Sequence, residues 1–407
     1  MPSDEELAFL ERIRALPDDD GPRLIYADWL DDRADARGPL IRVQCALAHL
    51  PGDDPRRADL MQEEASQLQT LEPAWKVALH GLAADWTCSR GLIEAISVDA
   101  EAFVERGEDI FRLGPIRRVR FLEASRCFPR LMACPTLARV PEIDLCGNFL
   151  GNAAIAHLAS ARHLHQLRSL HLGFNDLTDQ GLRALAEIPH LSQLRELYLD
   201  DNKHLAATGL RPLADSPYMA NLRLLDLSGN NLTEPALKVL LNGEAITRLE
   251  SLRLAGNDIG DGGVAALARS ALLPRMLRFC PSLDLCRNNI GPVGARALAD
   301  SPSVEMLEEL DLGSNAIGNT GLTSLAQSAY LGKLKRLAVS ENRISDAGVM
   351  AVARSALPAS LEFLDLTGNF VTAESIDALD STAIGYDWRK HLEIQTDPGL
   401  MRSRRRR

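Results

Sequence analysis

Aromatic residues and long hydrophobic runs are scarce in this sequence. Aromatic side chains account for only 5% of its 407 residues, although hydrophobic residues reach 46%. Leucine and alanine supply most of the apolar side chains, which is typical of many small, similar layers. No run approaches the roughly 18 apolar residues that a membrane span needs. The sequence therefore predicts a folded protein without a membrane segment.

The seven cysteines include no Cys-x-x-Cys pair. Their odd number and spacing fit neither a disulfide framework nor a zinc ribbon, and we interpret them as reduced thiols. The N-terminal stretch MPSDEELAFLERIRALPDDD is acidic and lacks the basic and apolar regions of a signal peptide. We therefore expect a cytoplasmic protein.

Acidic residues outnumber basic ones outside the C-terminus. The net charge is −11, but the last six residues, RSRRRR, contain five arginines, which leaves −16 for the rest of the chain. Such an acidic body argues against nonspecific nucleic-acid binding. We expect residues 402–407 to form a basic disordered tail that is either simply solvated or a contact for nucleic acid or anionic lipid.

Catalytic motifs are missing as well. The sequence contains no G-x-x-x-x-G-K-[ST], H-E-x-x-H or G-x-S-x-G motif. His163, His165 and His171 lie close together in the sequence, but the first two fall in an expected connection and the third on an expected strand. We therefore predict ordinary surface histidines there, and no enzymatic activity, cofactor or metal site.

What the sequence has in abundance is one repeated unit. The pattern L-x-x-L-x-L-x-x-N recurs with spacings of 27, 27, 28, 27, 31, 27, 27 and 27 residues between its asparagines. This regularity predicts a stack of similar structural units. The repeat asparagines are Asn148, Asn175, Asn202, Asn230, Asn257, Asn288, Asn315, Asn342 and Asn369.

Each part of the unit has a physical role. The alternation of Leu310 and Leu312 places both side chains on one face of a short strand and leaves Asp311 on the other. An inward-pointing asparagine then bonds backbone groups that the following turn would leave unpaired. Apolar residues at helical spacing, such as Leu322 and Leu325, follow. Because one unit cannot bury both faces, the copies are expected to stack into a solenoid.

The unit LxxLxLxxNxLtdxGlxxLa resembles the ribonuclease-inhibitor type of leucine-rich repeat over about residues 135–380. The resemblance implies an α/β solenoid, a right-handed horseshoe with a concave parallel sheet, convex helices and a concave face that binds proteins. Segments 92–99 and 116–124 keep the strand rhythm without the asparagine, so we expect two degenerate first coils, eleven strands and an array over 91–380. Residues 381–401 are predicted to be a C-terminal cap.

Residues 1–80 are predicted to be helices separated by acidic, proline-containing turns. The stretch DDDGPRLIYADWLDDRADARGPLIRVQCAL (18–47) resembles the small repeat-companion domain of bacterial proteins. This resemblance implies a bacterial origin and no activity, with residues 1–50 as a helical companion domain and 51–90 as a helical connection and N-terminal cap. The motif residues are Arg23, Leu24, Tyr26, Ala27, Asp28, Trp29, Leu30, Arg37, Gly38, Ile41, Arg42 and Gln44.

The concave face is where we expect binding residues, because its strand side chains point away from the helices. Five aspartates occupy the middle strand position. They either form a stripe for a basic partner or are simply the common residue at this position of the repeat strand. A mixed aromatic and charged patch is predicted on the second and third repeats, formed by His171, Phe174, Tyr198, Asp200 and Asp201, with Arg253 and Arg287 nearby. The middle column reads Asp144, His171, Tyr198, Asp226, Arg253, Asp284, Asp311, Ala338 and Asp365.

The sequence thus favours a noncatalytic scaffold that binds another protein, of unknown identity, on the concave face. The alternative is the regulation of an enzyme, because Ran GTPase-activating proteins use a similar solenoid, although this chain lacks their long acidic tail. No membrane partner is expected, and nucleic acid only through the C-terminal arginines. The candidate partner-binding residues are His171, Phe174, Tyr198, Asp200, Asp201, Asp226, Arg253, Asp284, Arg287 and Asp311.

Overall fold

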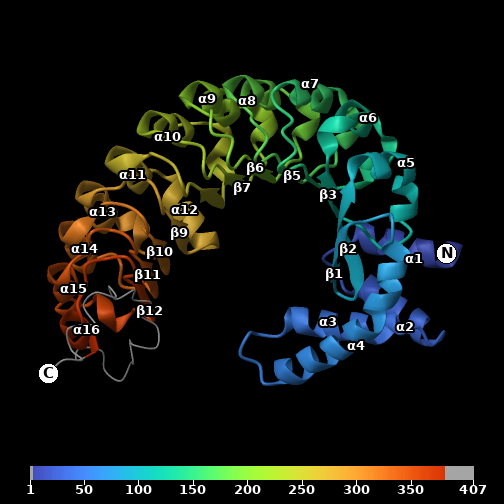
Figure 1. Cartoon of the computed structure of the whole chain (residues 1–407), viewed down its shortest axis with the longest axis horizontal. Helices are drawn as coiled ribbons and strands as arrows, with labels where there is room; N and C mark the ends of the chain where they lie inside the picture. The colour runs from blue at the N-terminus through green and yellow to red at the C-terminus, as the bar shows by residue number, and fades with distance from the viewer. Residues whose placement is uncertain (1–2, 381–407) are drawn as a thin grey trace, which may run out of the picture. The chain divides into compact units, whose positions relative to one another are not determined.

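The computed structural model describes residues 3–380, which divide into two compact units (Figure 1). Unit 1 ends at Leu172 and unit 2 begins at Gly173. Each unit contains a stack of strand, turn and helix coils. The expected C-terminal cap and the basic tail lie outside the described residues.

Unit 1 opens with four helices, the first three of which share one apolar core. They are α1 (Asp4–Ala15), α2 (Gly21–Asp31), α3 (Arg37–His49) and α4 (Arg56–Leu79). Ser3 caps α1 by accepting a hydrogen bond from the N–H of Glu6 at 3.2 Å. The core consists of Leu10, Ile13, Tyr26, Ala27, Leu30, Ile41, Cys45 and Leu92. Because Leu92 belongs to the first array strand, the helical module packs directly against the array.

A fully buried arginine attaches this module to the same strand. Arg23 donates hydrogen bonds to the carbonyls of Pro17 at 2.8 Å and Asp19 at 3.2 Å, and to the carboxylate of Glu94. The side-chain oxygen of Gln44 accepts a bond from the N–H of Gly91 at 2.6 Å. Arg23 and Gln44 belong to the motif of residues 18–47, so the motif serves attachment to the following coil.

The array strands of unit 1 pair in parallel and in chain order. They are β2 (Leu92–Asp99), β3 (Arg118–Leu122), β4 (Glu142–Asp144) and β5 (Ser169–His171). The α-helices between or after them are α5 (Ala100–Ile110), α6 (Phe128–Ala133) and α7 (Ala153–Ser160), with short 3-10 helices η1 (Ala124–Arg126), η2 (Pro135–Arg139) and η3 (Arg162–Leu164). The segments 92–99 and 116–124 therefore supply strands, as the two degenerate coils require.

One strand of unit 1 differs from the sequence expectation. Residues 85–89, placed in a helical connection, form β1 (Asp85–Ser89), which pairs antiparallel with β2. The hairpin turn uses Arg90 and Gly91, whose φ angles are 48° and 81°. Two consecutive positive φ angles suit the right-handed twist of a tight hairpin. The edge of β2 that would otherwise be unpaired is thus hydrogen-bonded to β1.

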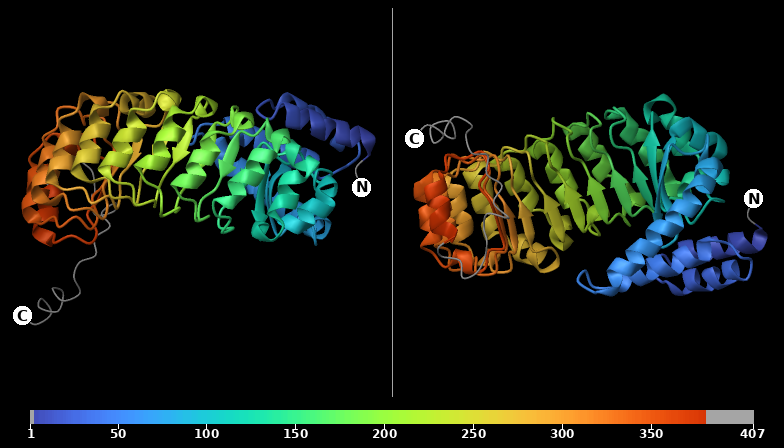
Figure 2. Two further views of the ribbon diagram at one scale, coloured as in Figure 1. Left: turned by 90° about the horizontal axis from the view of Figure 1, so that it is seen from above. Right: turned by 60° about the horizontal axis from the view of Figure 1, so that its bottom comes forward.

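Unit 2 continues the same coil with seven further strands. Its strands lie on one side and its helices on the other (Figures 1 and 2). Its strands are β6 (Glu196–Tyr198), β7 (Leu224–Asp226), β8 (Ser251–Arg253), β9 (Ser282–Asp284), β10 (Glu309–Asp311), β11 (Arg336–Ala338) and β12 (Phe363–Asp365). Its α-helices are α8 (Asp179–Ala186), α9 (Ala207–Asp215), α10 (Glu234–Leu241), α11 (Gly260–Arg269), α12 (Leu272–Phe279), α13 (Pro292–Ala299), α14 (Gly318–Ala326), α15 (Asp346–Ala353) and α16 (Ala373–Asp380). The 3-10 helices are η4 (Pro189–Leu191), η5 (Pro217–Met219), η6 (Ala245–Arg248), η7 (Pro302–Val304) and η8 (Leu357–Ala359).

The register of the parallel strands stacks identical positions of successive coils. Leu283, Leu310, Leu337 and Leu364 are direct partners across β9 to β12. All four are at most 3% exposed, so the leucine column forms a continuous core. The parallel solenoid that the repeat spacing predicts is therefore the observed fold.

The repeat asparagines bond one coil to the next. The side-chain oxygen of Asn315 accepts bonds from the N–H groups of Asn288 and Ile290, both at 2.9 Å. Its amide nitrogen donates to the carbonyls of Leu285 at 3.0 Å and Leu312 at 2.9 Å. Each asparagine thus satisfies backbone groups that the turn leaves unpaired. Equivalent bonds involve Asn202, Asn230, Asn257, Asn342 and Asn369.

The 31-residue spacing between Asn257 and Asn288 interrupts this pattern. The additional residues lie in the segment 270–280, which contains α12, and within the described part of unit 2 no strand ladder joins β8 to β9. The side-chain oxygen of Asn288, which is fully buried, accepts no hydrogen bond from the described residues. The N–H of Gly256 still reaches the carbonyl of Cys286 at 2.9 Å. This coil boundary keeps its turn contact but loses the bonds of the ladder.

Candidate functional site: the open face of the repeat sheet

The open face is the side of each sheet that the helices leave uncovered. Along a strand, alternate residues point to opposite sides, so Leu310 enters the core while Glu309 and Asp311 lie on the open face. Helices and the leucine column hold the strands in register. Side chains of the open face are therefore positioned by the fold without being part of its core.

The aspartates of the middle column have a structural task in their own coils. Each accepts a hydrogen bond from the backbone N–H two residues later, as in Asp311 to Gly313 at 2.7 Å and Asp226 to Ser228 at 3.0 Å. The short side chain closes the turn that follows the strand. The same contact occurs at Asp144, Asp284 and Asp365. This hydrogen bond across the turn explains why aspartate recurs at the middle position of the strand.

Two of the five aspartates also form ion pairs on the open face. In unit 1, Asp144 lies 3.0 Å from the guanidinium of Arg118. In unit 2, Asp226 lies 3.3 Å from Arg253, whose guanidinium is also 5.7 Å from the ring centre of Tyr198. Tyr198, Asp226 and Arg253 therefore form one connected cluster, as part of the predicted patch.

The other three aspartates, which we call the acidic strip, lack a cationic partner. Asp284, Asp311 and Asp365 lie on β9, β10 and β12, and none forms an ion pair with a described residue. Burial raises the pKa of the Asp311 carboxyl, and the charges of Asp284 and Asp365 raise it further, against the bond from Gly313. The acidic strip is therefore a surface of unbalanced negative charge.

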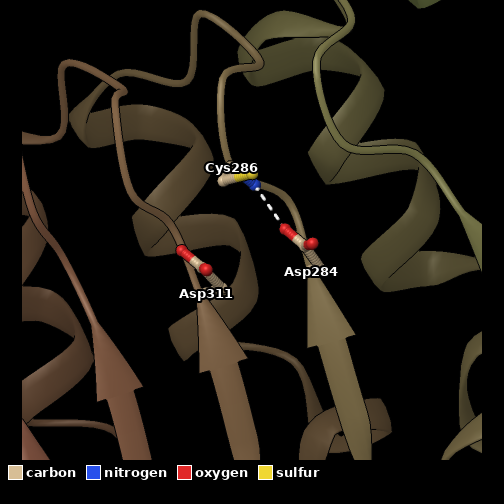
Figure 3. Close-up of side chains that lie close together, drawn as sticks. All are labelled: Asp284, Cys286 and Asp311. Carbon is tan, nitrogen blue, oxygen red and sulfur yellow. Dashed lines mark hydrogen bonds between the residues drawn. The ribbon is translucent and has the colours of Figure 1, made fainter. Parts of the chain in front are cut away.

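A thiol lies beside this strip (Figure 3). The potential metal-ligand atoms of Asp284, Cys286 and Asp311, which are carboxylate oxygens and a thiol sulfur, lie within 4.8 Å of one another. The N–H of Cys286 bonds to Asp284 at 2.9 Å. Burial and a hydrogen bond to Asp284 raise the pKa of the Cys286 thiol to about 12. Because metal ions bind the thiolate and not the thiol, this cluster is a poor metal site at neutral pH.

The predicted patch is only partly brought together. Phe174 and Asp201 lie in turns after the strands, and the N–H of Phe174 bonds to the carbonyl of Asp200 at 2.9 Å. Arg287 is exposed in the turn after β9 and has no ion pair with the described residues. His171 is the last residue of β5 in unit 1, whereas the rest of the patch lies in unit 2.

The three clustered histidines do not converge in the described structure. His163 lies in η3 and His165 ends that turn, while His171 lies on β5, 3.3 Å from the hydroxyl of Ser169. No group of metal-ligating atoms within residues 3–380 includes them. They occupy a connection and a strand, the places that the repeat pattern indicates.

The residue before each repeat asparagine has a positive φ throughout unit 2. Glycine fills this position in three coils, with φ of 67° or 68°. Five other coils place a side chain there, with φ between 51° and 54°, and we call these residues the turn row. A residue with a side chain pays roughly 1–2 kcal/mol for this conformation. The turn row consists of Phe174, Asp201, Arg287, Ser314 and Glu341.

Sequence reasoning missed two arginines in unit 1. Arg118 and Arg120 lie on the open face of β3, on either side of the buried Val119. The alternation of basic and apolar residues in RVRFL is the signal that marks them. They were overlooked because this coil lacks the asparagine that aligns the other coils.

Family models for leucine-rich repeats match the chain in six segments. One model matches residues 163–186, 247–268, 282–299, 305–326 and 333–353, and a second matches 221–242. These segments coincide with the coils described above. The chain contains leucine-rich repeats.

Solved structures similar to this chain include an internalin and a chain of a yeast complex. An internalin, InlF, from Listeria monocytogenes is 16% identical, with 75% of this chain and 91% of the internalin covered and a TM-score of 0.40. A chain from the structure of the Rad7 and Elc1 complex in yeast is 12% identical. The match covers 98% of this chain and 100% of that chain, with a TM-score of 0.43. No curated protein matches the leucine-rich-repeat chain in sequence. Among residues 3–380, no helix is both long and apolar enough to cross a membrane.

Proposed function

We propose that this leucine-rich-repeat protein is a noncatalytic scaffold that binds another protein through the open face of unit 2. The turn row carries the proposal. Its five side chains occupy a position where glycine would relieve backbone strain, and Phe174 is 47% exposed. A bulky or charged residue at such a position costs stability without filling the core. Partner binding is a function that would retain it.

The acidic strip indicates the chemistry of that partner. Asp284, Asp311 and Asp365 need one oxygen each to close their turns, and their remaining negative charge has no counterion among the described residues. Arginine or lysine side chains of a partner would relieve the repulsion within the strip. We therefore propose that the bound protein presents a basic segment to β9, β10 and β12.

The finer assignments of the leucine-rich repeats rest on the sequence resemblance. We propose the ribonuclease-inhibitor-like subtype because the 27-residue unit places a helix after each strand in the coils of unit 2. The companion identity of the N-terminal module and the bacterial source are proposals of the same kind, whereas the proposed cytoplasmic location rests on the cysteines and the acidic N-terminal stretch.

Capture from native extract on immobilised full-length protein tests the proposal. One variant carries Phe174→Gly, Asp201→Gly and Arg287→Gly, and a second carries Asp284→Asn, Asp311→Asn and Asp365→Asn. A control for net charge carries the substitutions Glu187→Gln, Glu305→Gln and Glu374→Gln, at exposed residues off the open face.

We expect one protein to bind the wild type and the charge control, and to be lost from both open-face variants. Its binding should also weaken as salt is raised, because the proposed contact is between exposed charges. Equal capture by all four proteins would contradict the assignment of the open face.

A further inference from the structure

Unit 1 has its own hollow on the open face, at the strand with the smallest side chains. On β2, Ala95 and Ser97 point to this face and lie directly beside Arg118 and Arg120 of β3. Long side chains beside short ones leave a depression of about 240 Å³. Thr87 of β1, which pairs with Ala95, lines the opposite side.

Two arginines and two aspartates line this hollow, and only one of each forms an ion pair. Arg118 is paired with Asp144 at 3.0 Å, and the Asp144 side chain is only 8% exposed. Asp85 accepts a bond from the N–H of Trp86 at 2.9 Å. Arg120 is exposed and forms no ion pair or hydrogen bond with any residue in the described range 3–380. The guanidinium of Arg120 is therefore the available cation of the hollow.

Two hydroxyl groups line the hollow together with Arg120. Ser97 is its direct neighbour across the strand pair, and Thr87 lies one strand further away. Neither hydroxyl makes a hydrogen bond within the described chain. A planar guanidinium and two hydroxyls form a donor set for the two oxygens of a carboxylate.

We propose that this hollow binds the carboxylate of an aspartate or glutamate in an extended segment of a partner protein, with Arg120 as the main contact. One negative charge matches the single available guanidinium. Asp85 and Asp144 line the same hollow and would repel the second charge of a phosphate group. An extended segment presents alternate side chains to the sheet, so one carboxylate enters the hollow while the backbone lies across the strands.

This inference is independent of the proposed role of unit 2. It concerns an acidic segment, whereas the unit 2 proposal concerns a basic segment. It also uses only residues of unit 1. Loss of basic-segment binding at the acidic strip would leave it standing, and its own failure would leave the unit 2 proposal unaffected.

The test uses the full-length chain and a fluorescent peptide, acetyl-(Ser-Glu)₄-amide. Its neutral counterpart is acetyl-(Ser-Gln)₄-amide, and inorganic phosphate is a competitor. Arg120→Gln removes the charge but keeps much of the side-chain length. Arg162→Gln, at an exposed arginine of η3 in the same unit, is the matched control. Ser97→Leu fills the hollow without changing Arg120.

We expect Arg120→Gln and Ser97→Leu to weaken binding of the glutamate peptide about tenfold or more, since hydrogen bonds to charged groups are the strong class. Arg162→Gln should bind like the wild type, and the glutamine peptide should bind no protein. The proposal would be overturned if Arg120→Gln and Arg162→Gln lost equal affinity, or if the wild type bound both peptides equally or neither. It would also be overturned if phosphate displaced the glutamate peptide at an equal concentration. Unchanged melting temperatures of the exposed-arginine variants show that the comparison reports binding.

Discussion

At the residue scale, the same coil position serves stability in some repeats and surface chemistry in others. Gly229, Gly256 and Gly368 adopt positive φ without strain, whereas Arg287 and Phe174 hold nearly the same backbone with large side chains. The fold tolerates this because neighbouring coils hold the turn in place, as in the bond from the N–H of Arg287 to the carbonyl of Gly313 at 2.9 Å. Stability and recognition are therefore expected to oppose each other at this position.

Arg287→Gly should make the protein more stable. Glycine relieves roughly 1–2 kcal/mol of left-handed strain and loses about 0.5–1 kcal/mol through greater freedom of the unfolded chain. A net gain of up to about 1 kcal/mol is expected in urea unfolding. Arg195→Gly is the control, because Arg195 is exposed in the same unit but has no positive φ. That variant should lose stability, and a loss in both would refute the role of strain.

Asp311→Asn should raise stability at neutral pH and leave it unchanged in acid. Because the folded-state pKa of Asp311 is raised, the stability that this group contributes is fully present below its unfolded pKa. It is lost as pH rises through the folded pKa. Asparagine can still accept the bond from Gly313, but carries no charge. The expected gain at pH 7 is at most about 1 kcal/mol.

Thermal unfolding of both proteins from pH 3 to pH 8 checks this expectation. The difference between them should appear only above the unfolded carboxyl value of about 3.9. A difference that is constant across the range would mean that the effect does not come from ionisation of Asp311.

At the element scale, the asparagine of each coil is a connector whose strength depends on its neighbour. Asn315 uses its oxygen and its nitrogen to bond both adjoining backbone segments. Asn288 donates to the carbonyls of Leu254 at 2.9 Å and Cys286 at 3.0 Å, but its oxygen has no donor among the described residues. The extra helix α12 thus weakens one specific boundary of the array.

Asn315→Ala should therefore cost more stability than Asn288→Ala. The first substitution removes the partner of the buried N–H groups of Asn288 and Ile290 and of the Leu285 carbonyl, and each unsatisfied group costs about 1–3 kcal/mol. The second removes one of two bonds at the carbonyls of Leu254 and Cys286, which keep the bonds from the Asn257 side chain and from the N–H of Gly256. It also removes a side-chain oxygen that has no donor among the described residues. Free energies of unfolding of the two variants, measured in urea, give the comparison. Equal losses would show that the oxygen of Asn288 is satisfied in solution.

At the scale of the whole molecule, the N-terminal helices and the first coils behave as one body inside unit 1. Arg23 crosses from α2 to β2 and is fully buried, while the Glu94 side chain is 13% exposed. Leu92 shares a core with α1, α2 and α3. The helical module therefore covers the start of the array, where an exposed hydrophobic coil would otherwise face water.

Glu94→Ala should destabilise unit 1 by about 3–5 kcal/mol, because the buried guanidinium of Arg23 loses its counterion. The double variant Arg23→Met, Glu94→Ala should lose less than the sum of the two single losses, since the second substitution removes the uncompensated charge. Unfolding in urea followed by the fluorescence of the tryptophans in residues 29–86 measures both. Additive losses would show that the pair is not coupled.

The local repeat determined much of this protein without any tertiary information. Leucine spacing and the recurring asparagine specify the parallel coils, because every unit has the same short-range pattern and must bury it against a copy of itself. The aspartates of the open face were also visible in the sequence. Their turn-closing role was not, because the bond from Gly313 to Asp311 appears only with the backbone conformation.

Tertiary structure alone decided which charges of the open face remain unpaired. Arg118 and Asp144 are 26 residues apart and lie on adjacent strands, so their pairing depends on register and side-chain reach. The hairpin of β1 and the hollow over Ala95 and Ser97 likewise depend on strands from a coil without the asparagine. Sequence periodicity sets which residues reach the surface. Only packing between coils decides which of them are left to bind something else.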